Sequence, residues 1–85
     1  MPADTLKPVH VRYFAILREQ RGVAEESFET EAATATALYQ ELQTRHGLAI
    51  PPESLRVAIN DEFVPWETEI KPGDRVVFIP PVAGG

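Results

Sequence analysis

Residues 75–85 read RVVFIPPVAGG, an apolar run followed by two prolines and a slender Gly-Gly end. The first five residues are β-branched or aromatic apart from Arg75, which is the strongest strand signal in the chain. Directly before them, Lys71-Pro72-Gly73-Asp74 places Pro and Gly in the two central positions of a type II turn. We therefore expect a buried strand over residues 75–79 and an extended tail over residues 80–85.

A second strong strand signal lies near the other end of the chain, over residues 9–17. Its side chains alternate, so that Val9, Val11 and Tyr13 share one face. Weaker patterns predict an exposed strand over residues 25–30, a strand over 55–59 and a short return strand at 63–64. Asn60-Asp61 fits the tight turn between the last two.

One amphipathic helix is predicted over residues 34–46. Thr34 is a good N-cap, Ala35, Leu38 and Leu42 fall on one face, and Gly47 follows as a C-terminal stop. A single short helical turn is expected over residues 17–21, ended by Gly22.

The order of these elements predicts an α+β domain. Pairing the two most apolar strands in parallel at the sheet centre, with the helix crossing one face, satisfies the right-handed crossover rule. This arrangement is the ubiquitin-like β-grasp: a mixed sheet with one main helix packed on one face. We expect a flexible leader over residues 1–8, the domain over 9–79 and the tail over 80–85. Val77 and Ile79 point away from the helix, so the second sheet face should keep an apolar contact site.

Composition excludes several functions. The 85-residue chain has no cysteine, which removes disulfides and thiolate metal sites, and its net charge of −5 disfavours nucleic acid. The sequence shows no signal peptide and no apolar run of membrane-spanning length, so we expect a cytoplasmic protein that contacts no membrane. His10 and His46 lack further ligands at metal-binding spacing, and no nucleotide-binding glycine pattern occurs. We expect no bound metal or cofactor.

Three other features have ordinary structural readings beside functional ones. Arg18, in a charged turn, is either a docking residue or a solvated side chain. The carboxylates from Glu25 to Glu31 fit an exposed strand surface, since nothing apolar brackets them to raise a pKa. Trp66 fits a partly buried cap on the core and, alternatively, a partner contact.

Together these residues resemble a known family, the molybdopterin synthase small subunits, which are β-grasp sulfur carriers. The resemblance covers nearly the whole chain from Val9. It is carried by residues 11–15, by Ala58-Ile59-Asn60-Asp61 and, most specifically, by the Pro-Pro-Val-small-Gly-Gly tail after an apolar strand. Residues 1–8 and 47–54 depart from the family's shorter members, at positions away from the expected chemistry.

The resemblance implies a cycle with several partners. A ubiquitin-activating-like adenylyltransferase would adenylate the Gly85 carboxylate using ATP and Mg²⁺, and a sulfur donor protein would convert it to a thiocarboxylate. The molybdopterin synthase large subunit, in a heterotetramer, would pass that sulfur to cyclic pyranopterin monophosphate. The chain alone would have no activity.

The same resemblance assigns a docking face and a threaded tail. The docking face would comprise Phe14, Arg18, Phe63 and Ile79. The tail would comprise Pro80, Pro81, Val82, Ala83, Gly84 and Gly85. Glycine has no Cβ, so a Gly-Gly end is slim enough to enter a partner's active site. The five residues after Pro80 span at most roughly 17 Å.

Two alternatives stay open. One is a related β-grasp sulfur carrier for thiamine or tRNA thiolation, or a small ubiquitin-like protein modifier; all share the Gly-Gly end, and the Pro-Pro-Val-Ala spacer favours the molybdopterin branch. The other is a binding module with an incidental tail, which would work normally without Gly84 and Gly85.

Overall fold

The computed structural model describes residues 6–80 of the chain. Its strands are β1 (Lys7–Tyr13), β2 (Glu25–Thr30), β3 (Arg56–Ile59), β4 (Glu62–Val64) and β5 (Arg75–Ile79). Its helices are α1 (Ile16–Arg21) and α2 (Ala35–His46), with a 3₁₀ turn η2 (Pro52–Ser54). In this described part, neither α1 nor α2 has the length and apolar character that crossing a membrane requires.

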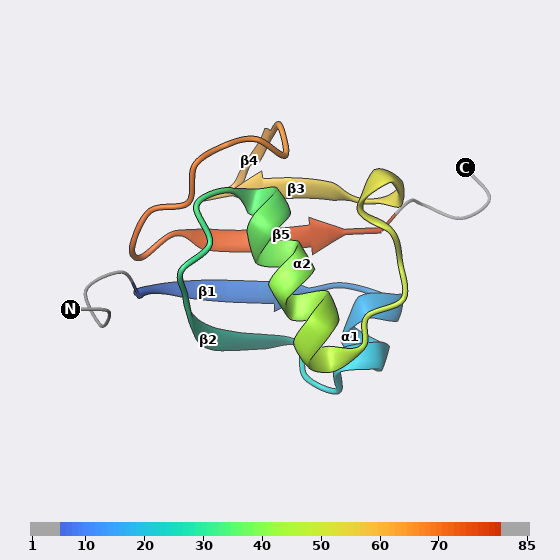
Figure 1. The fold of residues 1–85 in the computed structure, drawn as a ribbon. Coiled ribbons are helices and arrows are strands. Elements are labelled where there is room, and N and C mark those ends of the chain that lie inside the picture. Colours follow the sequence, from blue (N-terminus) through green and yellow to red (C-terminus); the bar gives the residue numbers. More distant parts are fainter. Residues whose placement is uncertain (1–5, 81–85) are drawn as a thin grey trace.

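The five strands form one mixed sheet in the order β2-β1-β5-β3-β4. β1 and β5 run parallel at its centre, and all other neighbours are antiparallel. Figure 1 shows α2 crossing one face of this sheet, over β5 and β1. The predicted parallel pairing of the two apolar strands, the mixed sheet and the single covering helix are thereby confirmed.

Local sequence explains α2. The Thr34 Oγ1 accepts a hydrogen bond from the Ala37 N–H at 3.2 Å, which satisfies one of the free donors of the first turn. The helix ends at Gly47, whose N–H donates to the Gln43 carbonyl. Its buried residues are Ala35, Leu38, Tyr39 and Leu42, the predicted face together with one tyrosine.

The core lies between α2 and the sheet. Val9, Val11 and Tyr13 of β1 and Val76 and Phe78 of β5 are all buried and face the helix. An aromatic cluster closes one end of the core: the Trp66 ring stacks on Phe78 at a centroid distance of 5.8 Å, and Tyr39 lies tilted against both rings. Trp66 therefore caps the core, the first of its two predicted roles.

The predicted strand over residues 9–17 is wrong at both ends. Lys7 and Pro8 pair with β2, so they belong to the sheet and not to a leader. At the other end the chain leaves the sheet after Tyr13, because Ala15 adopts a positive φ of 54° and the Leu17 N–H donates to the Phe14 carbonyl. These bonds turn the chain into α1, which starts at Ile16.

The two predicted turns are confirmed. Asn60 and Asp61 both have positive φ, as the turn of a tight hairpin requires. Gly73 has a φ of +84°, and the Asp74 N–H donates to the Lys71 carbonyl, so this is the type II turn. The Asp74 carboxylate accepts from the Lys71 N–H and from the Asn60 amide, which ties the two turns together.

At the end of the sheet away from these two turns, a polar cluster joins β1, α1, β2 and α2. The Glu26 carboxylate of β2 accepts hydrogen bonds from the Tyr13 hydroxyl at 2.6 Å and from both Nε and a terminal nitrogen of Arg21 in α1. The His46 Nε2 at the end of α2 lies 3.7 Å from the same carboxylate. Burial opposes the charged form of Glu26, but the hydrogen bonds from Arg21 and Tyr13 outweigh it and lower its pKa.

Glu26→Gln should therefore destabilise the fold in a pH-dependent way. At neutral pH we expect a loss of about 1–3 kcal/mol in the free energy of unfolding, since Arg21 loses a charged acceptor. Because the folded pKa of Glu26 lies below its ordinary value of 4.5, the parent's advantage is complete above that pH and is lost as the pH falls through the folded pKa. Urea unfolding across this range measures it.

Glu29→Gln is the matched control, because Glu29 is an exposed carboxylate on the same strand. It should change stability by less than about 0.5 kcal/mol at any pH. A Glu26→Gln effect that does not change with pH would contradict a role for the ionised carboxylate.

Candidate functional site

The sheet face opposite α2 carries an apolar surface. On β5, Val76 and Phe78 are fully buried against the helix, whereas Val77 and Ile79 are half-buried on the open side. In the sheet register Ala58 of β3 lies opposite both Val77 and Phe63. The predicted apolar surface on the uncovered face is therefore present.

Phe14 joins these residues around one shallow hollow of about 210 Å³. Arg12 and Asp61 also line it. Phe63 is 61% exposed and Phe14 is 37% exposed, unusually high for aromatic side chains beside a core. We name five residues the open-face patch: Phe14, Ala58, Phe63, Val77 and Ile79.

The structure thus brings together three of the predicted docking residues, Phe14, Phe63 and Ile79. Ile79 is the last residue of β5, and Pro80 directly after it is half-buried. The open-face patch therefore reaches the point from which the tail sequence continues. The remaining predicted tail residues lie outside the described residues: Pro81, Val82, Ala83, Gly84 and Gly85.

Arg18, the fourth predicted docking residue, lies elsewhere. It is exposed on α1, and its carbonyl accepts the Gly22 N–H that ends the helix. It does not line the hollow of the open-face patch. A docking role for Arg18 therefore requires a partner that also reaches α1.

Two other arginines contact the patch, and sequence reasoning did not single them out. The Arg12 guanidinium lies 5.4 Å from the Phe14 ring centroid, and that of Arg56 lies 4.9 Å from the Phe63 centroid. The alternation of side chains along a strand could have identified them. It places Arg12 on the same sheet face as His10 in β1, and Arg56 on the same face as Ala58 in β3.

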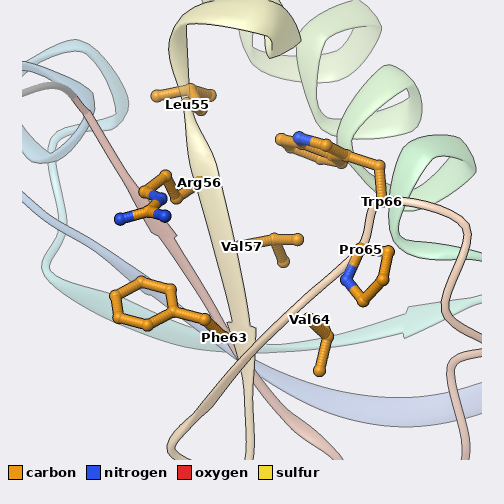
Figure 2. A pocket seen from close by; sticks show the side chains of 7 residues that line it. All are labelled: Leu55, Arg56, Val57, Phe63, Val64, Pro65 and Trp66. Carbon is orange, nitrogen blue, oxygen red and sulfur yellow. The ribbon is translucent and has the colours of Figure 1, made fainter.

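A second hollow, of about 410 Å³, continues from Phe63 around the edge of the sheet. Figure 2 shows Arg56 and Phe63 on one side of β3, and Val57, Val64, Pro65 and Trp66 on the other. The pairing of β3 with β4 stops at Val57 and Val64. Pro65 comes next and has no N–H to extend the ladder, which leaves the edge of β3 open there.

Polar contacts on the open face are local pairs. His10 hydrogen-bonds Glu25 at 2.6 Å, and that bond lowers the pKa of the Glu25 carboxyl, more than burial raises it. Arg75 pairs with Asp61 at 2.9 Å. His46 is the last residue of α2. Among residues 6–80 no cluster of three or more metal-ligating side chains occurs.

A mixed five-stranded sheet with a central parallel pair and one covering helix defines a ubiquitin-like β-grasp protein, here with an apolar surface beside the exit of its last strand. The chain belongs to the ThiS family, whose model matches residues 11–85.

Two curated relatives match this chain in sequence over almost their whole length. The chain is 39% identical over 80 residues to the molybdopterin synthase sulfur carrier subunit of Haemophilus influenzae, covering 91% of this chain and 99% of that protein. It is 35% identical over 82 residues to the human molybdopterin synthase sulfur carrier subunit, covering 91% and 93%.

Solved structures are similar as well. One from Pyrococcus furiosus, described as molybdopterin converting factor subunit 1, has a TM-score of 0.74 at 34% identity and covers 89% of this chain and 99% of that one. A chain in the complex of subunits 1 and 2 of the Helicobacter pylori molybdopterin-converting factor has a TM-score of 0.63 at 32% identity, covering 92% and 99%. A chain in the Amycolatopsis orientalis BexX/CysO complex has a TM-score of 0.67 at 32% identity, covering 91% and 99%.

Loss of a phenylalanine ring should reduce the free energy of unfolding far more on the helix-covered face of the sheet than on the open face. Phe63→Ala should change the free energy of unfolding by less than about 0.5 kcal/mol, because the ring is mostly exposed. Phe78→Ala should cost about 3–5 kcal/mol, because that ring is fully buried in the aromatic cluster. Chemical denaturation of both variants measures the contrast, and equal losses would mean that Phe63 is part of the core.

Proposed function

We propose that this chain is the sulfur carrier subunit of a molybdopterin synthase. The observation that carries the proposal is the position of the open-face patch, which lies where β5 leads into the Pro-Pro-Val-Ala-Gly-Gly sequence. A carrier needs both parts next to each other: a surface that docks, and a slender end that reaches into the docked partner. The named relatives support this reading.

In the proposed cycle the Gly85 carboxylate carries the sulfur. A free α-carboxyl has a pKa of about 3.5, so at neutral pH it is ionised and can attack the α-phosphate of ATP. An activating enzyme that binds ATP and Mg²⁺ would form the acyl adenylate and release pyrophosphate. A sulfur donor protein would then deliver sulfur at the hydrosulfide level, which displaces AMP and leaves a thiocarboxylate. The thiocarboxylate would donate its sulfur to cyclic pyranopterin monophosphate, and water would restore the Gly85 carboxylate.

The partner for that last step is the synthase large subunit. We propose that it docks on Phe14, Phe63 and Ile79, with Arg18 at the margin and Pro80 guiding the tail. The Helicobacter pylori complex of subunits 1 and 2 supports a partner of this kind. The apolar open-face patch would lose its contact with water on docking, which is the main source of affinity in such interfaces.

A second candidate is a sulfur carrier that serves another biosynthetic pathway. The similarity, at 32% identity, to a chain of the BexX/CysO complex supports keeping it, because that complex is named without reference to molybdopterin synthase. The two candidates share activation at Gly85 and differ in the acceptor of the sulfur. Chemically prepared thiocarboxylate of this chain, offered to the large subunit with cyclic pyranopterin monophosphate, separates them: formation of the dithiolene supports the synthase, and its absence supports the other pathway.

Deleting Gly85 should abolish sulfur transfer and leave the fold intact. The deletion withdraws the reacting carboxylate by roughly 3.5 Å, whereas a misplacement of about 1 Å can already cost a hundredfold in rate. Gly84→Val should also block transfer, because a branched side chain widens the part of the chain that must be threaded. Adenylation is measured by ATP–pyrophosphate exchange, and sulfur transfer with the prepared thiocarboxylate.

Ala49→Val is the matched control for added bulk, because Ala49 is exposed in the connection after α2. It should retain parent activity in both assays, and all variants should keep the parent Tm. Near-normal adenylation and transfer by the Gly85 deletion would reject the carrier function.

A further inference from the structure

Arg12 and Arg56 lie on the two strands that flank β5. In the sheet register Arg12 of β1 lies opposite Val77, and Arg56 of β3 lies opposite Ile79. Strand spacing and rise place their Cα atoms roughly 12 Å apart, diagonally across the open-face patch. The strand that leads into the tail therefore emerges between two cationic side chains.

Each of these guanidinium groups rests on an exposed aromatic ring of the patch, Arg12 over Phe14 and Arg56 over Phe63. A cation–π contact of this kind engages the guanidinium on the side of the ring, and its remaining N–H groups can bind a carboxylate. Stacking also restricts the long side chain in advance, which reduces the entropy that a partner's carboxylate must offset on binding.

Neither of these two arginines forms a salt bridge within residues 6–80. The nearest counter-charge of Arg12 is Glu25, which lies opposite it in the register of β1 and β2 and hydrogen-bonds His10. The described salt bridges engage three other arginines, Arg21, Arg45 and Arg75. Arg45 provides an internal comparison: it stacks on Phe28 at 5.1 Å in the same manner, on the helix side of the molecule, but it also pairs with Glu41.

The open-face patch is thus an apolar centre flanked by two available cations, on a chain whose net charge is −5. A purely apolar partner surface would cover these cations without supplying a carboxylate that pairs with either of them. A partner with an apolar centre and carboxylates opposite both arginines matches the surface in shape and in charge.

We propose that Arg12 and Arg56 select the docking partner by pairing with two of its carboxylates on either side of the apolar contact. The partner is the synthase large subunit, so this inference rests on the proposed function. The apolar residues of the patch supply most of the affinity. The two arginines accelerate encounter, orient the carrier so that the tail faces the active site, and disfavour surfaces that lack the acidic pair.

The test is the association of full-length carrier with the large subunit from the same organism, measured by stopped-flow fluorescence at about 0.02 M and about 0.3 M salt. The double variant Arg12→Gln/Arg56→Gln should associate roughly tenfold more slowly than the parent at low salt. The difference should shrink at high salt, where the Debye length is shorter. The double variant with Lys at both positions keeps the charges and should stay within about threefold of the parent rate.

Arg45→Gln is the matched control, because it removes a stacked arginine from the other face. It should leave the association rate and its salt dependence unchanged. Phe63→Ala, by contrast, should act mainly on the dissociation rate, since it removes apolar contact. Circular dichroism confirms that each variant is folded, as expected for substitutions of exposed residues.

The outcomes distinguish failure of the proposed function from failure of the role of Arg12 and Arg56. If the parent does not bind the large subunit, both the proposed function and this inference fail. If the parent binds and transfers sulfur but the double Gln variant associates at the parent rate with the parent salt dependence, only the selection by Arg12 and Arg56 fails. The selection would also be overturned if the double Gln variant associated more slowly than the parent by the same factor at both salt concentrations. The arginines would then act without their charge.

Discussion

The parallel pairing of β1 with β5 is the contact on which the rest of the structure depends. Parallel neighbours cannot be joined by a tight turn, so the chain between them must leave the sheet and return. Between β1 and β5 the chain forms β2, β3 and β4, and α2, which connects β2 to β3, crosses the sheet and covers one face with its apolar side (Figure 1). A single helix covers a single face, so the opposite face of the same two strands is left open. The core and the candidate docking surface are therefore two sides of one pair of strands.

The central elements could be predicted because their sequence signals are local and agree with one another. Gly73 in its turn, the apolar residues of β5 and the Thr34 cap of α2 each indicate a structure that the neighbouring segments also require. The first strand was harder to delimit. Phe14 continues the alternation of β1 in the sequence, but the positive φ of Ala15 ends the strand, and no glycine marks that position.

The site was predictable only in part, for a similar reason. Phe14, Phe63 and Ile79 are conspicuous as apolar residues on a face that no helix covers. Arg12 and Arg56 are ordinary outward-facing residues in sequence. Their importance depends on which strands flank β5 and on the register between them, since a shift of one residue would move each to the other face. Arg18 shows the converse: its sequence position is near Phe14, but α1 carries it away from the hollow.

The two edges of the sheet show how the molecule limits where it can bind. β2 carries Glu25 and Glu29 on its solvent side, and β4 is only three residues long and is followed by Pro65. Charged and short edge strands resist pairing with strands of other chains. A protein that offers an exposed apolar surface in a crowded cell risks forming fibrils through its sheet edges. Here one edge strand is charged and the other is short, so among the described strands only the short stretch of β3 beyond Val57 is left open to a further strand. Self-association through the edges is thereby discouraged without burying the surface that partners need.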